Sequence, residues 1–296
     1  MPNKIPSLSS PSYYPFSTLT KPLNYPGVFL LELHARPDNR LTESFLQSSL
    51  IAPLLDVERE FRASLLGRLE ASSEPSQGWK APLQPGQYAL VTCGPQDKNR
   101  FYSNGLDLTQ ALASDHFFQH VLNRMYETFL RFPIPTVAAI NGHAFAAGFC
   151  LALAHDHKII KDNEGKGKAL MAMNEVEFGA PVPLGLLAVI KAKFPTDSAI
   201  RKCVTEAHRF GVKDVLSLGL VDAAAPENQV VEASLKLAFD KSIKATTGVY
   251  GEIKESLYKK YIDELNCDDG RHQEINSIHM SRLKRLGLTP YGKSKL

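Results

Sequence analysis

Long apolar runs and closely spaced cysteines are both missing from this 296-residue sequence. No run approaches the roughly 20 apolar residues that a helix needs to cross a bilayer, so we expect no membrane span. The four cysteines, Cys93, Cys150, Cys203 and Cys267, are far apart, which excludes a zinc knuckle or a redox pair of neighbouring thiols. Three of the four lie among apolar residues and are expected to be buried free thiols, as in a reducing compartment.

A strong charge bias is also missing. The 34 Lys and Arg residues nearly balance the 31 Asp and Glu residues, for a formal net charge of +3. Nucleic-acid-binding domains carry a dense basic stripe, and because none is present we expect no nucleic-acid partner. With 44% hydrophobic residues, the chain can bury the core of one large domain with a helical appendage.

The two ends of the chain carry different signals. Residues 1–26 are rich in Ser, Pro and Tyr and lack the apolar centre of a secretory signal, so they are interpreted as an N-terminal extension. The chain ends in Ser294, Lys295 and Leu296, the tripeptide that the peroxisomal import receptor reads. The alternative is a random basic tail. We expect an exposed tail over 289–296 and a location in the peroxisome matrix.

Short apolar segments alternate with segments of helical periodicity. The predicted strands are 27–34, 88–93, 136–140, 159–160 and 170–173. The predicted helices are 42–65 with a break near Pro53, 115–132, 228–243, 248–266 and 271–286, and a loop is expected over 94–105. Alternating strands and helices predict an α/β core. We place this core at 27–225 and a C-terminal helical region at 226–288.

Two segments could bring backbone N–H groups to a ligand. In the first, the Asn104-Gly105 turn precedes Asp107, which can open a helix and leave the N–H of Leu106 pointing into a cleft. In the second, residues 141–154 are small and run from a buried strand into a helix, where unpaired N–H groups attract negative charge. An ordinary loop–helix junction explains the first equally well, and close helix packing explains the second.

A third segment brings acids into an apolar stretch. Glu175 and Glu177 follow Met171 and Met173, and a carboxyl group among such neighbours should have a raised pKa, as a proton shuttle near neutral pH requires. If the segment is extended, the two side chains face opposite ways, one into a cleft and one into solvent. Two surface glutamates on a loop are the alternative.

The order and spacing of these three segments resemble the crotonase (enoyl-CoA hydratase/isomerase) superfamily. The resemblance covers about 27–225, including the strand that breaks at Arg36-Pro37 and the helix end at 219–222. It implies an α/β fold, a spiral of ββα units with a helical C-terminal region, assembled as a homotrimer or homohexamer. It also implies an acyl-CoA substrate and no metal or redox cofactor.

The resemblance assigns roles to particular residues. Leu106 and Ala147 match the positions whose backbone N–H groups form the oxyanion hole for the thioester carbonyl, and Glu175 matches an acid–base glutamate. Cys150 stands where hydratases of the family have a second glutamate, and a neutral thiol activates water poorly. Pro183 stands where dienoyl-CoA isomerases have an aspartate. One acid with no partner is the pattern of the peroxisomal Δ3,Δ2-enoyl-CoA isomerases. Asn174-Glu175 resembles their local motif.

We therefore expect Glu175 to move a proton from C2 to C4 of a 3-enoyl-CoA during β-oxidation of unsaturated fatty acids. The candidates for the substrate lining are Phe101, Phe145, Phe149 and Met171, and Arg40 is the candidate for the CoA phosphates. Core packing explains the four apolar candidates equally well. Two alternatives stay open: hydration or thioester hydrolysis, with Glu177 assisting, and a non-catalytic acyl-CoA-binding subunit.

Overall fold

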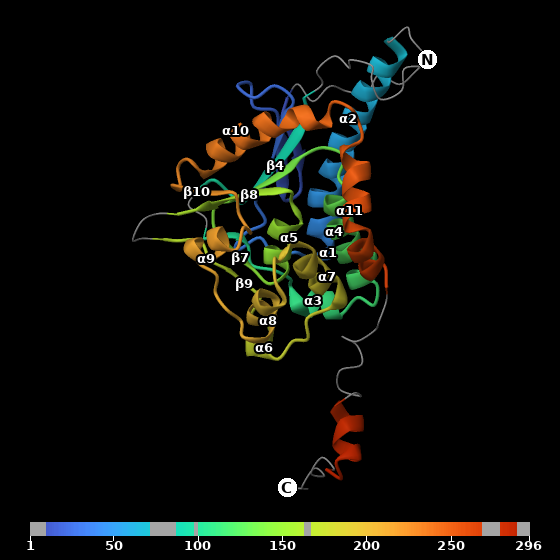
Figure 1. The fold of residues 1–296 in the computed structure, drawn as a ribbon, viewed down its shortest axis with the longest axis vertical. Helices are drawn as coiled ribbons and strands as arrows, with labels where there is room; N and C mark the ends of the chain where they lie inside the picture. Colours follow the sequence, from blue (N-terminus) through green and yellow to red (C-terminus); the bar gives the residue numbers. More distant parts are fainter. Residues whose placement is uncertain (1–9, 72–86, 98–99, 163–166, 268–278, 289–296) are drawn as a thin grey trace.

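A computed structural model of the chain describes residues 10–71, 87–97, 100–162, 167–267 and 279–288. Its main sheet has seven strands within these residues, in the order β1-β2-β3-β4-β6-β8-β10 (Figure 1). The strands are β1 Ser12–Tyr14, β2 Ser17–Thr20, β3 Val28–Leu33, β4 Ala89–Cys93, β6 Thr136–Ile140, β8 His157–Lys161 and β10 Ala223–Ala225. The last five are parallel, and the α/β class is confirmed.

The N-terminal residues belong to this sheet. Strands β1 and β2 form an antiparallel pair, and β2 pairs with β3 so that Leu19 lies opposite Leu31. Leu19 is 1% exposed. The described part of the predicted extension 1–26 is therefore integral to the sheet. The composition rich in Ser, Pro and Tyr hid these strands, because their burial depends on pairing with β3 rather than on their own apolar content.

A second, smaller sheet lies beside the first. Its three short parallel strands, β5 Phe101–Ser103, β7 His143–Phe145 and β9 Met171–Ala172, are arranged in the order β5-β7-β9. The predicted loop 94–105 contains β5, so that prediction is wrong for residues 101–103. The predicted strand 170–173 is present as β9.

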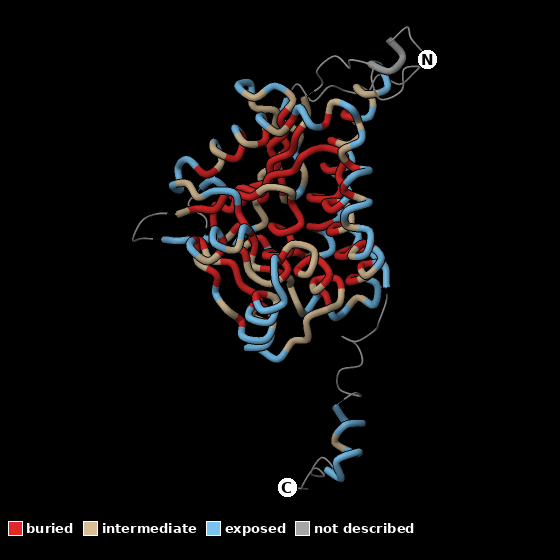
Figure 2. Tube along the Cα trace, in the orientation of Figure 1, coloured by how far each residue is buried: buried red, intermediate tan, exposed pale blue. Residues whose placement is uncertain are grey.

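Helices cover both faces of the main sheet. After a short first helix, the helices are α2 Ala52–Ala71, α3 Leu108–Leu112, α4 Asn123–Leu130, α5 Ala147–Ala154, α6 Glu175–Phe178, α7 Leu184–Lys193, α8 Asp197–Thr205, α9 Val212–Ser217, α10 Val230–Ser242 and α11 Tyr250–Leu265. Helix α10 packs on one face through Leu235 and Ala238, against Val91 and Val137. The other face carries the larger core, which includes α4, α5 and α7. Figure 2 shows the buried residues gathered along the strands and the helices beside them.

The predicted helix 42–65 is present, and its form changes next to its proline. Thr42 caps a short turn, α1 Glu43–Phe45, which continues through a π-helical segment, Leu46–Ile51, into α2. Pro53 is the second residue of α2, directly after the π-helical segment. The predicted helix 115–132 similarly contains a π-helical segment, Phe117–Leu122, before α4.

The C-terminal helices are close to their predicted bounds. Helices α10 and α11 match 228–243 and 248–266 within two residues. Of the predicted helix 271–286, residues 279–285 are helical and 271–278 lie outside the described residues. The tail 289–296, with Ser294, Lys295 and Leu296, also lies outside them. No helix in the described part of the chain is long and apolar enough to cross a membrane.

Candidate active site

The three segments that contain Leu106, Ala147 and Glu175 meet at one edge of the small sheet. Leu106 follows β5, Ala147 follows β7 and Glu175 follows β9. These strands are parallel neighbours, so their carboxyl ends lie at the same edge. Ligands of α/β proteins commonly bind outside the carboxyl ends of parallel strands. Residues that are some 70 positions apart in the sequence thus converge on one place.

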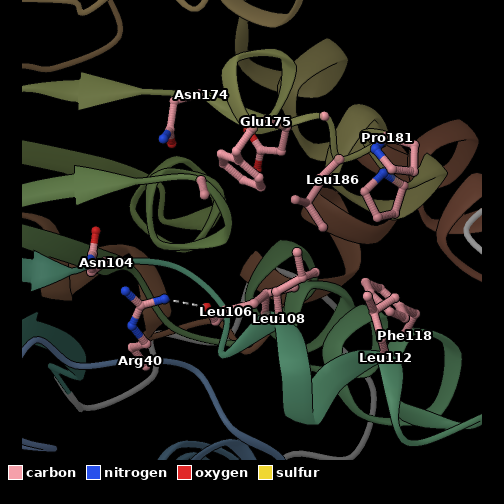
Figure 3. A pocket seen from close by; sticks show the side chains of 15 residues that line it. Arg40, Asn104, Leu106, Leu108, Leu112, Phe118, Asn174, Glu175, Pro181 and Leu186 are labelled. Atoms are coloured by element: carbon pink, nitrogen blue, oxygen red, sulfur yellow. Dashed lines mark hydrogen bonds between the residues drawn. The ribbon is translucent and has the colours of Figure 1, made fainter. Parts of the chain in front are cut away.

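A pocket of about 590 Å³ opens at this edge. Its lining residues are Arg40, Asn104, Leu106, Leu108, Leu112, Phe118, Ala146, Asn174, Glu175, Phe178, Gly179, Ala180, Pro181, Pro183 and Leu186. Figure 3 shows Arg40, Asn104 and Asn174 on one side of the pocket and the apolar residues Leu108, Leu112, Phe118, Pro181 and Leu186 on the other. Glu175 and Leu106 lie between the two groups. The pocket therefore has a polar half and an apolar half.

Glu175 is a buried carboxyl group on the wall of this pocket. It begins helix α6 and is only 6% exposed. Burial raises its pKa to about 7, and the backbone N–H groups of Glu175 and Asn174 oppose this shift by less. Its Oε2 has no hydrogen-bond partner among the described residues. A carboxyl group that is poised near neutral pH with one oxygen uncommitted can take up and return a proton.

Glu177 has a different environment. The segment 175–177 is helical, not extended, because both glutamates lie on the four-residue helix α6. The Glu177 carboxylate nevertheless faces away from the pocket and accepts two hydrogen bonds from Arg209, at 2.7 and 2.8 Å. This ion pair is exposed and lowers the pKa of Glu177. The Glu177 side chain is therefore engaged at the surface and does not line the pocket.

The backbone segments of Leu106 and Ala147 lie against each other. Gly105 has φ +80°, and a Cβ added there would be 3.3 Å from the Ala147 nitrogen and 2.8 Å from the Ala146 Cβ. Only glycine allows this approach. Ala147 is the first residue of α5, so its N–H has no partner within the helix. Among the described residues, we find no hydrogen bond donated by the Leu106 or Ala147 amide.

The start of α5 is held in place from two sides. A Cβ added at Gly148 would be 2.4 Å from the Ser103 carbonyl oxygen, so this glycine lets α5 sit directly on the end of β5. The buried Tyr126 hydroxyl, on α4, donates a hydrogen bond of 2.9 Å to the Ala147 carbonyl. Because both contacts are buried, the amide at the helix start is fixed before a ligand binds.

Arg40 lies at the polar side of the pocket, as the sequence predicts for a residue near the ligand. It donates to the Leu106 carbonyl at 3.1 Å and pairs with Asp38 at 3.2 Å. About half of its side chain is exposed. It therefore presents positive charge at the mouth of the pocket while bracing the Leu106 backbone.

The four apolar lining candidates lie elsewhere. Phe149 and Met171 are fully buried in the core, where Phe149 packs against the Phe194 and Phe210 rings. Phe101 and Phe145 make an edge contact with each other and do not line the pocket. These residues are on the strands and on α5, whereas the pocket lies beyond the strand ends. The apolar lining instead comes from α3, from Phe118 on the π-helical segment, from α6 and α7, and from the segment between α6 and α7.

Cys150 is fully buried beneath the pocket. Its Sγ lies 3.8 Å from the Met173 sulfur and 3.7 Å from the Leu186 carbonyl oxygen. Burial raises the pKa of this thiol well above its ordinary value, and the nearby Glu175 adds to the shift. Cys150 thus remains a neutral thiol. Pro183 lines the pocket and provides no acid.

The sequence of the chain matches one known family. The sequence model described as enoyl-CoA hydratase/isomerase matches residues 89–284. The chain belongs to the enoyl-CoA hydratase/isomerase family. Among curated proteins, it is 34% identical over 206 residues to enoyl-CoA delta isomerase 3 of Arabidopsis thaliana, covering 66% of this chain and 80% of that protein. It is 36% identical over 171 residues to the Arabidopsis enoyl-CoA delta isomerase 2, peroxisomal, covering 54% and 70%.

Solved structures of two acyl-CoA enzymes share the fold. An enoyl-CoA hydratase from Mycobacterium marinum aligns with a TM-score of 0.66 at 18% identity, covering 88% of this chain and 98% of that one. A methylmalonyl-CoA decarboxylase aligns with a TM-score of 0.67 at 14% identity, covering 96% and 100%. The crotonase-type fold expected from the sequence is confirmed.

Proposed function

We propose that this protein is a Δ3,Δ2-enoyl-CoA isomerase that moves a double bond in a fatty acyl-CoA. The observation that carries the proposal is the single buried carboxyl group of Glu175, whose pKa is about 7, on the wall of the pocket. The names of the Arabidopsis relatives, which are enoyl-CoA delta isomerases, support the same activity. A neutral thiol at Cys150 supports isomerisation over hydration, since hydration needs a group that activates water.

In the proposed mechanism, one carboxyl group serves two carbon atoms. The Glu175 carboxylate removes a proton from C2 of the 3-enoyl thioester, and the electron pair delocalises into a dienolate. The protonated carboxyl group then delivers the proton to C4, and the double bond ends between C2 and C3. The unpartnered Oε2 is the atom available for this exchange. Atoms and charge balance without any further reactant.

The dienolate oxygen needs hydrogen-bond donors. We assign this role to the Leu106 and Ala147 amides, whose backbone segments lie against each other at Gly105 and which donate to no described residue. Donors that are fixed before the charge develops stabilise an oxyanion without having to reorganise. The contacts of Gly105, Gly148 and Tyr126 provide that fixation.

The two halves of the pocket orient the substrate. The CoA part, with its phosphates, lies toward Arg40 at the polar side, and the acyl part lies toward Leu108, Phe118 and Leu186. The apolar half also limits the access of water to the dienolate. Coenzyme A enters as part of the substrate, and no step of this mechanism calls on a metal or a redox cofactor.

We also propose that the protein works in the peroxisome matrix during β-oxidation, as a homotrimer or homohexamer. The terminal Ser294-Lys295-Leu296 and the peroxisomal names of two Arabidopsis relatives support the location. The import receptor would then be a partner of the tail.

A direct assay tests the activity. Purified protein should convert 3-enoyl-CoA to 2-enoyl-CoA far faster than it adds water to 2-enoyl-CoA. Because the base must be ionised, kcat/KM for isomerisation should rise with pH, reach half of its maximum near pH 7 and level off above it. Hydration at a comparable rate, or a profile that is flat from pH 5 to pH 8, would count against the proposed chemistry.

A further inference from the structure

The apolar half of the pocket reaches the surface of the protein. Two of its lining residues, Leu112 on α3 and Phe178 on α6, are each 54% exposed. Leu108 precedes Leu112 by one helical turn, so the two side chains lie on the same face of α3. Large exposed apolar side chains around a pocket mark a surface that an apolar ligand covers.

The interior beneath Glu175 leaves no room for an acyl chain. Phe149, Cys150 and Met173 are fully buried there. The Cys150 sulfur already contacts Met173 and the Leu186 backbone. A substrate held at Glu175 therefore cannot extend its tail inward between the sheet and α5.

The outward direction is apolar along its whole length. From Glu175, the lining passes Leu186 and Pro181 on one wall and Leu108 and Phe118 on the other, as Figure 3 shows. On the wall of Leu108 and Phe118 it ends at the exposed Leu112, whereas Phe178 lies one helical turn from Glu175 on α6. Among the lining residues on this side of Glu175, none is charged. A hydrocarbon chain that leaves along this line is in apolar contact up to the surface.

We infer that the enzyme favours long-chain 3-enoyl-CoA substrates, with the distal tail lying against Leu112. The inference rests on the proposed isomerase function. It makes Leu112 a determinant of chain length, because the first carbons of any acyl chain are already enclosed by Leu108, Phe118 and Leu186. Only a longer tail reaches Leu112.

The test compares 3-hexenoyl-CoA with 3-dodecenoyl-CoA. Complete burial of one methylene group is worth about fourfold in affinity, so partial burial of six should raise kcat/KM for the longer substrate by about tenfold or more. Leu112→Ser should reduce the ratio of the two kcat/KM values by about threefold. Leu216→Ser, at an exposed residue of α9 outside the pocket lining, should leave the ratio unchanged.

Two results would overturn the inference. One is a ratio near one in the wild-type protein; the other is an equal loss for both substrates in the Leu112 variant, which would place this residue at an interface instead. Calorimetric binding of the saturated hexanoyl-CoA and dodecanoyl-CoA separates this question from catalysis. Tighter binding of dodecanoyl-CoA that depends on Leu112, without turnover of any 3-enoyl-CoA, would reject the isomerase function and keep the tail site.

Discussion

Glu175→Gln should reduce kcat for 3-enoyl-CoA isomerisation by about a thousandfold, the scale of general acid–base catalysis. Glutamine has nearly the same shape but can neither remove the C2 proton nor carry it to C4. The described lining of the pocket holds no second acid to replace it: Glu177 is bound by Arg209 at the surface, and Cys150 is a neutral thiol. The measurement is steady-state turnover of 3-enoyl-CoA.

The chain provides a matched control for this variant. Glu177→Gln makes the same chemical change two residues away, at an exposed position outside the pocket lining, and should leave turnover close to the wild-type rate. Binding of a saturated acyl-CoA should be retained in Glu175→Gln, since the rest of the pocket is intact. Normal turnover by Glu175→Gln would rule out this residue as the acid–base group.

Ala147→Pro should reduce kcat/KM by about a hundredfold or more, the usual loss when one oxyanion donor is removed. A backbone donor cannot be removed by most substitutions, but proline lacks the N–H. Ala147 is the first residue of α5, the helical position at which proline is best tolerated. The substitution therefore removes the donor with little direct cost to the helix.

Ala147→Gly is the control, because it shortens the side chain and keeps the N–H. It should retain most of the activity. Thermal unfolding of both variants shows whether each is folded, since Ala146 has φ 52° and its conformation must persist next to the proline. A folded Ala147→Pro protein with wild-type kcat/KM would show that this amide does not hold the thioester oxygen.

The main sheet could be predicted from the sequence because its central strands are apolar runs. The predicted strands 27–34, 88–93 and 136–140 correspond to β3, β4 and β6, which are almost entirely buried. Such runs carry their own signal, since both faces of a parallel strand are covered by helices. The C-terminal helices α10 and α11 were similarly evident from their periodicity.

The small sheet could not be predicted in the same way. Strands β5 and β7 have three residues each, too few for a period of two to be recognised. Their pairing joins segments about 40 residues apart and depends on close backbone contacts at Gly142 and Gly148. Such contacts are a property of the folded chain, and no local pattern in the sequence reports them.

The site was predictable where the chemistry is local and not where it depends on the path of the chain. The sequence pointed to Glu175 because an acid stands in an apolar stretch, and the structure places it in the pocket with a raised pKa. Arg40 and Leu106 also line the pocket. Phe149 and Met171 were candidates only for their apolar character, which the core uses instead.

The central claim is that the Glu175 carboxyl group serves both C2 and C4. The transfer of deuterium within the substrate tests this claim most directly. The substrate is 3-enoyl-CoA carrying deuterium at C2, and the product of the first turnovers is analysed for label at C4. Part of the deuterium should reappear at C4, because Glu175 removes and returns it in a pocket with limited access to water. Product that contains only solvent hydrogen at C4 would contradict it.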